Sequence, residues 1–585
     1  MSRAETSAAS ATRSTKSAFP ALVAAVLCSG LISACSSLPK FQAIPTADVA
    51  AMRADVNFLA ADALQGRETG SAGYQQAADY VAQRFASLGL TSITGDDYFQ
   101  QVPFREARWP THSAHRATLM LHSREGDITF ELGSDFIAAP PAISEDTATN
   151  GGLVFVGYGI EAPEFGLDDY AGLDVQGKIV VMLDGRPQRL PNEVGAHFAS
   201  GRSKRATAAR HGAVGYITLN TPAREYRRPF ARSAEHIPDP SFDWVRADDI
   251  PGNAIPGLHP GVLLDIPAAK QLFMGAERSL DTIFTETANG LVPAGFPLPY
   301  TATLTSRAEH RKVISPNVVG LLPGSDPDLK DEYVVFSAHL DHIGVDKPGR
   351  HDAPRSGHDA VASGPSASQS APLDRINNGA QDNAAGIAVM LEVARLFVES
   401  GRAPRRSILF VAVTAEEEGL LGSDYFAQHP PVPPKSMVAN INLDMPMLLY
   451  PFKDVIAFGA EHSSLGKTAA RAAERAGLKV SPDPMPEQVI FVRSDHYSFV
   501  RQGVPAIYLI TGRDAIDDEI DGAGAQIEFL KTRYHRPSDE ADDQISYIAA
   551  QQFAEVNYAI AREVTDADEK PRWNRGDFFG NLYTN

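Results

Sequence analysis

Histidine and acidic side chains follow three apolar runs in the C-terminal half of the sequence. The runs are YVVFSA (333–338), SILFVAVT (407–414) and VANINL (438–443). The residues at or just beyond their ends are His339 and Asp341, Glu416 to Glu418, and Asp444. Such runs are typical of parallel strands covered on both faces, and an open α/β sheet binds ligands at the carboxyl ends of its strands. Imidazole and carboxylate groups gathered there are ligands for zinc.

The segment AHLDH places His339 and Asp341 two residues apart. In an extended strand both side chains then point to the same side, so Asp341 could accept the ring N–H of His339 and orient the ring toward a metal. A local hydrogen bond without a metal is the alternative. His342 is expected to be only a loop residue.

Asp382 lies where the loop NNGAQDNAAG enters an apolar helix. Alone, this position favours a helix N-cap, but a carboxylate near two cations can bridge them. The acidic triplet of TAEEEGLLGS is either a solvated turn or a group of carboxylates that cations must neutralise.

Two late motifs, RSDHYSF (493–499) and YHRPSDE (534–540), complete the set of candidate residues. A catalytic zinc needs nitrogen and oxygen ligands, an open position for water and a nearby base. Two sites that share a bridging ligand would be supplied by His339, Asp382, Glu417, Asp444 and His535, with Glu416 left as the base.

The elements that must position these residues alternate between strands and helices. Apolar spacing predicts helices over 74–88 and 383–400 and a last helix from about Ile545 to Ile560, and VPAIYLI (504–510) adds a fourth buried strand. From about Gly151 the pattern changes to short strands separated by Gly, Asp and Pro. The fold class is therefore α/β, with a doubly wound, mostly parallel mixed sheet flanked by helices and an inserted β-rich module.

Composition and the N-terminal residues constrain partners and compartment. A net charge of −19 on 585 residues argues against a nucleic acid partner. Basic residues precede an apolar run, Phe19 to Ile32, that is too short for a stable membrane span and is typical of a signal peptide. The run ends at LISAC, which resembles a lipobox, so Cys35 is the expected lipidation site. Ordinary cleavage nearby is the alternative.

Ser36 follows that cysteine, which favours an outer-membrane anchor, with membrane contact only through lipid. The other cysteine, Cys28, lies within the apolar run, so the mature chain has no disulfide. The sequence does not determine the oligomeric state.

Taken together, these motifs resemble the dizinc exopeptidases that include secreted bacterial leucyl aminopeptidases, glutamate carboxypeptidase and the transferrin receptor. The resemblance begins with FLAADALQGRETGSAGYQQAADYVAQRFASLGL (58–90) and runs in order through SAHLDH, NGAQDNAAG, AEEEGLLGS, NLDM, RSDHYSF and YHRPSD. It implies two zinc ions per chain, peptide substrates and, most directly, release of N-terminal residues. A carboxypeptidase or another amide hydrolase, and a receptor-like binding protein, are the alternatives.

The resemblance also implies a role for each residue. His339 and Asp444 would hold one zinc, Glu417 and His535 the other, and Asp382 would bridge the two. Asp341 would orient His339, and Glu416 would take a proton from the metal-bound water. Tyr534 and Arg493 would contact the carbonyl region of the substrate.

The strand-rich module contains FVGYGIEAPEFGLDDYAGLDVQGKIVVML (155–183), which resembles the protease-associated domain inserted in such enzymes. The predicted organisation is a signal peptide (1–34), a lipid-anchored tether (35–47), a peptidase domain in two parts (48–135 and 310–566), the inserted domain (136–309) and a C-terminal tail (567–585). Residues 345–374 lack apolar periodicity, so they are predicted to form a long loop, either a tolerated surface insertion or a gate over the site.

Overall fold

The computed structural model describes residues 44–95, 97–111, 116–347 and 374–584. Cys35, the signal-like run and most of the 345–374 insertion lie outside the described residues. The predictions made for them therefore stay predictions.

A ten-stranded mixed sheet carries the candidate site. Its strands, in spatial order, are β11 (Ser241–Trp244), β2 (Phe99–Arg108), β14 (Glu309–Leu322), β16 (Ser407–Val413), β15 (Tyr333–His339), β17 (Met437–Asn442), β20 (Ala506–Thr511), β18 (Asp454–Phe458) and β19 (Lys479–Ser481), with β1 (Thr91–Ser92) beside β14. The four central strands β16, β15, β17 and β20 are parallel. The four predicted buried strands are these four, so that prediction is confirmed.

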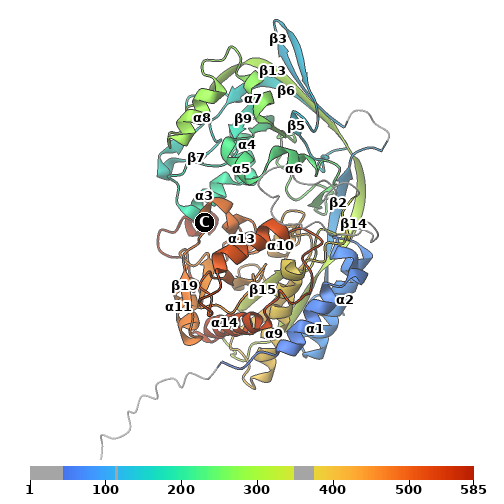
Figure 1. Ribbon diagram of the computed structural model, residues 1–585, viewed down its shortest axis with the longest axis vertical. Coiled ribbons are helices and arrows are strands. Elements are labelled where there is room, and N and C mark those ends of the chain that lie inside the picture. Colours follow the sequence, from blue (N-terminus) through green and yellow to red (C-terminus); the bar gives the residue numbers. More distant parts are fainter. Residues whose placement is uncertain (1–43, 96, 112–115, 348–373, 585) are drawn as a thin grey trace, which may run out of the picture. The chain divides into compact units, whose positions relative to one another are not determined.

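Helices cover both faces of this sheet (Figure 1). One core joins the sheet to α1 (Val49–Leu59), α2 (Ala72–Ser87), α9 (Ala385–Glu399), α11 (Leu465–Arg475) and α14 (Tyr547–Asp566). On the other face, α10 (Leu421–Gln428) and α12 (His496–Val500) supply Phe426 and Phe499 to a second core. The three predicted helices are present as α2, α9 and α14.

A second, eight-stranded sheet forms the β-rich unit. Its spatial order is β4 (Gly126–Phe130), β3 (Ala117–Ser123), β13 (Phe296–Arg307), β6 (Asp146–Phe155), β9 (Ile179–Leu183), β10 (Gly215–Leu219), β12 (Val262–Leu264) and β5 (Phe136–Ile137). A separate pair joins β7 (Glu161–Ala162) and β8 (Leu167–Asp168). The helices of this unit are α3 (Asn192–Ala199), α4 (Gly201–Arg210), α5 (Pro222–Arg227), α6 (Phe230–Ala234), α7 (Ile266–Leu272) and α8 (Leu280–Ala288).

The chain passes between the two sheets at sharply defined points. Strand β13 belongs to the second sheet and β14 to the first, with only Ala308 between them. At the other boundary the unit starts earlier than residue 136, because β3 and β4 already pair in the second sheet. Strand β11, from within the unit, pairs with β2 in the first sheet. Strand pairing over long sequence separations sets these limits, which local composition does not reveal.

A buried histidine, His462, links the β-rich unit to the C-terminal end of the chain. His462 Nε2 lies 2.7 Å from Glu193 Oε2 on α3, and its Nδ1 lies 2.6 Å from Asp577 Oδ2, which precedes α15 (Phe578–Tyr583). Burial lowers the pKa of His462, but the hydrogen bonds to Asp577 and Glu193 outweigh burial and raise the pKa to about 9. The protonated ring therefore bridges two carboxylates from separate parts of the chain.

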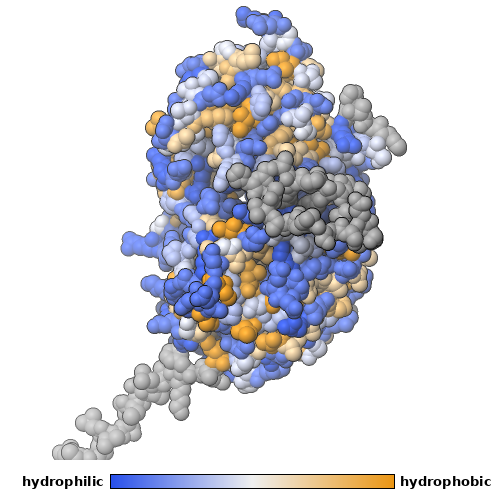
Figure 2. Space-filling view, in the orientation of Figure 1, coloured by the Kyte–Doolittle hydropathy of each residue, from blue (hydrophilic) through white to orange (hydrophobic). Residues whose placement is uncertain are grey.

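No helix among the described residues is both long and apolar enough to cross a membrane. The face in Figure 2 is mainly hydrophilic, with apolar residues in small scattered groups.

We expect the His462 bridge to give the protein a pH-dependent stability. Because the folded pKa of about 9 exceeds the ordinary 6.5, its contribution is complete below pH 6.5 and is lost as the pH rises through 9. The His462→Gln variant should be less stable than the parent by about 2 kcal/mol near pH 6, and this difference should shrink toward pH 10. Thermal unfolding followed by circular dichroism measures it. Exposed His259→Gln is the control, and an equal difference at both pH values would contradict the bridge.

Candidate metal centre

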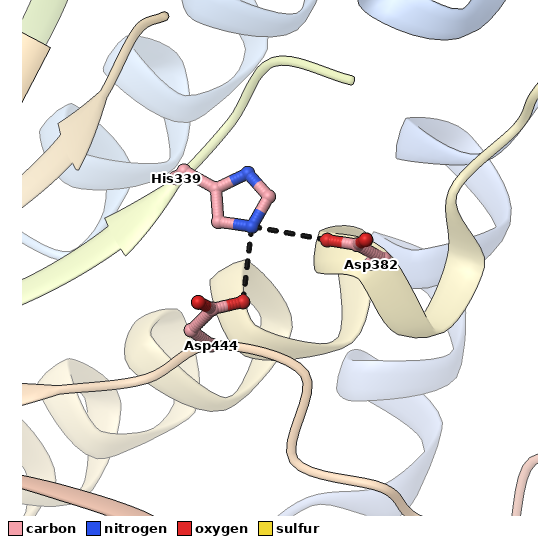
Figure 3. Close-up of side chains that lie close together, drawn as sticks. All are labelled: His339, Asp382 and Asp444. Carbon is pink, nitrogen blue, oxygen red and sulfur yellow. Dashed lines mark hydrogen bonds and ion pairs between the residues drawn. The ribbon is translucent and has the colours of Figure 1, made fainter. Parts of the chain in front are cut away.

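Three candidate ligands from separate elements meet at the carboxyl edge of the first sheet (Figure 3). His339 ends β15, Asp382 precedes α9, and Asp444 follows β17. His339 Nε2 lies 3.1 Å from Asp382 Oδ1 and 3.1 Å from Asp444 Oδ1. All three residues are buried. Their ligand atoms lie within 4.8 Å of one another, a spacing suited to holding one metal ion.

A second group forms on the other oxygen of Asp382. His535 Nε2 lies 3.2 Å from Asp382 Oδ2 and 3.1 Å from Glu417 Oε2. The Asp382 carboxylate thus faces two groups. One oxygen faces His339, which contacts Asp444, and the other faces His535, which contacts Glu417. This is the arrangement that a ligand shared by two metal ions requires.

The residues present fit zinc in both donor type and charge. Nitrogen and oxygen donors without thiolates suit Zn²⁺. Burial lowers the pKa of His535, yet Glu417 and Asp382 outweigh it and raise the pKa to about 10. The pKa of His339 is raised well above its usual range despite burial, chiefly by Asp444. The surrounding carboxylates therefore favour extra positive charge at the ring nitrogens, and a metal cation bound to the neutral ring supplies it.

The predicted contact between the Asp341 carboxylate and the His339 ring is wrong. His339 Nδ1 instead faces the backbone oxygen of Asp341 at 3.1 Å. The Asp341 carboxylate accepts the backbone N–H groups of Glu416 and Glu417, at 3.1 and 3.2 Å. The strand ends at His339, so the extended geometry behind the prediction does not reach Asp341. Asp341 consequently fixes the turn that carries the two glutamates.

The N-cap alternative for Asp382 is also wrong. Its side chain faces His339 and His535, and no side-chain cap bond starts α9. Asn383 takes the local role, accepting the backbone N–H of Gly386 at 3.1 Å. Asp539 accepts the backbone N–H of Asp382 at 3.1 Å and so holds the loop in place.

His342, expected to be only a loop residue, lies inside the site. It is buried, and its Nδ1 lies 2.7 Å from Glu417 Oε1. Its ligand atom also falls within 4.8 Å of Asp382 and Glu417. The signal was present in AHLDH, where a second histidine follows the first by three residues, but its direction depends on how the chain turns after β15.

Asp444 is held by a chain of buried hydrogen bonds. Ser494 Oγ donates to Asp444 Oδ2 at 2.6 Å, and Asn442 Nδ2 donates to Ser494 Oγ at 2.6 Å. Tyr508 donates its hydroxyl to the backbone oxygen of Asp444 at 2.9 Å. These contacts explain why RSDHYSF accompanies the site although the motif supplies no candidate ligand.

Arg67 is a buried cation beneath the site. Its guanidinium donates to the backbone oxygens of Leu340 at 2.9 Å, Asn378 at 2.7 Å and Gly379 at 3.1 Å, and also to Leu59. The first three carbonyls belong to the loops that present the candidate ligands. Burial lowers the pKa of Arg67 to about 10, and the nearby carboxylates of Asp341 and Asp539 oppose this effect. Sequence reasoning did not assign Arg67 a role.

Glu416 lies beside the candidate ligands. It belongs neither to the group around His339 nor to the group around Glu417. Burial raises the pKa of its carboxyl group well above the usual range; the positive charge of His339 opposes this rise, and Asp444 adds to it. A carboxyl group that can hold or release a proton therefore borders the cluster.

Tyr534 and Arg493 lie at the rim of the site. The rings of Tyr534 and His535 have centroids 3.9 Å apart and are tilted by 33°. Arg493 is exposed, whereas the next residue, Ser494, is buried against Asp444. Sequence reasoning missed a second group of arginines near them. These arginines belong to α5, α6 and the residues between them (REYRRPFAR, 224–232), and we call this stretch the arginine segment. Four arginines in nine residues were a visible signal, but only the fold brings them to this rim.

Buried His, Asp and Glu groups at the carboxyl edge of an α/β sheet form a site that suits metal ions. Residues 317–561 match the sequence model of peptidase family M28.

Curated relatives match parts of the chain. An aminopeptidase, YwaD, of Bacillus subtilis (strain 168) is 27% identical over 201 residues, which are 33% of this chain and 39% of the relative. A probable zinc metalloprotease of Pyrenophora tritici-repentis (strain Pt-1C-BFP) is 45% identical over 67 residues, 12% of this chain and 15% of the relative. The chain thus spans less than two thirds of the length of these relatives.

Among solved structures, the aminopeptidase from Aneurinibacillus sp. strain AM-1 is 20% identical, with 90% of this chain and 96% of that chain covered and a TM-score of 0.48.

We expect Arg67→Met to lower the free energy of unfolding by at least ~3 kcal/mol, because the carbonyl oxygens that it serves would lose a buried charged donor. Arg67→Lys should keep part of the stability. Thermal unfolding and zinc content measure both effects. Exposed Arg124→Met, in the β3–β4 turn, is the control; a loss for Arg67→Met no larger than for this control would refute the role.

Proposed function

We propose that the protein is a dizinc aminopeptidase that removes N-terminal residues from peptides. The observation that supports the proposal most is the position of Asp382, whose two oxygens face His339 and His535 separately. The M28 match over residues 317–561 and the name of the Bacillus relative agree with this activity.

In this proposal His339 and Asp444 would hold one zinc, Glu417 and His535 would hold the other, and Asp382 would be a ligand of both. Two zinc ions there would activate water by lowering its pKa and would polarise the scissile carbonyl. Asp341 fixes the Glu416–Glu417 turn, so the base and one ligand keep a constant spacing. Glu416 accepts a proton from the attacking water and transfers it to the leaving amine. Tyr534 and Arg493 line the rim where the substrate carbonyl enters.

A second candidate function is a carboxypeptidase that acts on acidic C-terminal residues. Such an enzyme needs arginines around its site, and the arginine segment with Arg493 supplies them. An acetylated N-terminus separates the two candidates, because it blocks an aminopeptidase and leaves a carboxypeptidase unaffected.

We also propose, from sequence alone, that the chain is exported and anchored through lipidated Cys35 to the outer membrane. The β-rich unit is proposed to be a protease-associated domain that restricts access to the site. Its contacts with the loop after β19, such as Asn192 Nδ2 to Asp483 Oδ2 at 2.9 Å, support this proximity.

We expect Glu416→Gln to abolish most hydrolysis while zinc stays bound. The amide cannot accept the proton, so kcat should fall about 10²–10⁴-fold. Amino-acid p-nitroanilides, free and N-acetylated, measure the rate, and atomic absorption measures zinc.

The matched control for this variant is Glu418→Gln, the adjacent acid of the same turn. Full activity of Glu416→Gln, or cleavage of acetylated substrates by the parent enzyme, would contradict the base assignment and the aminopeptidase proposal respectively.

Zinc stoichiometry tests the assignment of the ligands. The parent should bind about two zinc ions per chain, as two-metal hydrolases do. Asp444→Asn and Glu417→Gln should each lose mainly one ion, whereas Asp382→Asn should weaken both. Titration with zinc after chelation measures this. Equal loss from all three variants would argue against a bridging Asp382.

A further inference from the structure

The arginine segment lies against the loop that carries Arg493. Arg227 Nη1 donates to the backbone oxygen of Glu487 at 2.7 Å, and Arg493 Nη1 lies 3.4 Å from the backbone oxygen of Gln488. Arg186, from the same β-rich unit, reaches the backbone oxygen of Pro486 at 3.4 Å. The unit thus touches the loop that leads directly into Ser494. Ser494 in turn donates a hydrogen bond to Asp444.

A second contact fixes the other end of this region. Lys347 lies in the loop that follows His339. It donates to the backbone oxygen of Pro238 at 3.0 Å and forms an ion pair with Asp239 at 2.9 Å. The stretch from α5 to Asp239 therefore borders the site through both the 486–493 loop and the His339–Lys347 loop.

Positive charge accumulates where these parts meet. Arg228, Arg232 and Arg493 are all exposed, and no ion pair to them is found within the described chain. Desolvation lowers the pKa of Arg228, and the charges of Arg224 and Arg493 lower it further, while Tyr534 acts in the opposite direction. Arg228 is thus close enough to both rim residues to feel their charge.

Two acids of this stretch, Glu225 and Asp239, are bonded to other groups. Glu225 is occupied by Asn220 and by the backbone N–H of Phe230, at 2.7 and 2.8 Å. Asp239 pairs with Lys347. Elsewhere in this acidic chain, arginines are commonly paired; Arg501, for example, lies 3.0 Å from Asp424. Unpaired like charges repel one another unless an anion joins them.

We infer that Arg228 and Arg493 form a carboxylate-binding subsite at the rim of the metal centre. A guanidinium pair binds a carboxylate through charge-assisted, often bidentate hydrogen bonds. The ligand is the carboxylate of a bound peptide, supplied either by its C-terminus or by an acidic side chain. The inference deepens the proposed peptidase function and rests on it.

The test compares peptides that differ only in charge. Leu-Gly-Gly is compared with its C-terminal amide, and Leu-Glu-Gly-amide with Leu-Gln-Gly-amide, by isothermal titration calorimetry on zinc-loaded Glu416→Gln protein. We expect about tenfold tighter binding for at least one carboxylate-bearing member of the two pairs. The pair that shows the preference identifies the source of the carboxylate.

Adding Arg228→Gln should reduce that preference to about threefold or less, and Arg228→Lys should restore part of it, since a lysine keeps the charge but loses the planar fork. Arg124→Gln removes the same charge from a distant turn and should leave the preference intact. Raising the salt concentration should weaken the preference, because exposed charges are screened.

A preference below threefold in both pairs, including no measurable binding of any peptide, would overturn the subsite. So would a preference that persists in Arg228→Gln and Arg493→Gln alike. The parent enzyme tests the proposed function separately through hydrolysis of Leu-p-nitroanilide, which carries no carboxylate. Product analysis of Leu-Gly-Gly shows whether leucine or glycine leaves first.

Discussion

The structure depends on a concentration of buried carboxylates at one edge of a sheet. Asp341, Asp382, Asp444 and Asp539 are all buried there, and the glutamates of the triplet are half-buried beside them. Charges taken out of water cost several kcal/mol each unless they are paired and hydrogen-bonded. The surrounding contacts supply that compensation: backbone N–H groups bind Asp341 and Asp539, and histidine rings face Asp382 and Asp444. Metal cations are the remaining compensation that this donor set accommodates.

Sequence patterns predicted the parts of the fold that local chemistry determines. Apolar runs located β15, β16, β17 and β20, and the acids at their ends meet because parallel strands end at one edge. The grouping of His339 with Asp444, and of Glu417 with His535, came from the family resemblance, and the structure places these pairs together.

Most of the contacts that were missed join residues far apart in sequence. Arg67 reaches carbonyls more than 270 positions away, and Asp341 reaches the turn 75 positions later. His342 contacts Glu417 over the same separation of 75. Spacing indicates which side of a strand a residue faces, but it does not show where the chain turns once the strand has ended. The error over Asp341 and the omission of His342 both arise at that turn after β15.

The same reasoning explains why the arginine segment was not linked to the site. Its arginines lie more than 200 residues before Arg493, within a unit whose own strands form a separate sheet. The net charge of −19 means that the molecule as a whole repels anions at long range. Salt screens exposed charges beyond about 10 Å, so neither this repulsion nor the attraction of a few arginines acts far from the surface. The inferred subsite would therefore act on a peptide already in the site, by discriminating between bound substrates instead of accelerating their encounter.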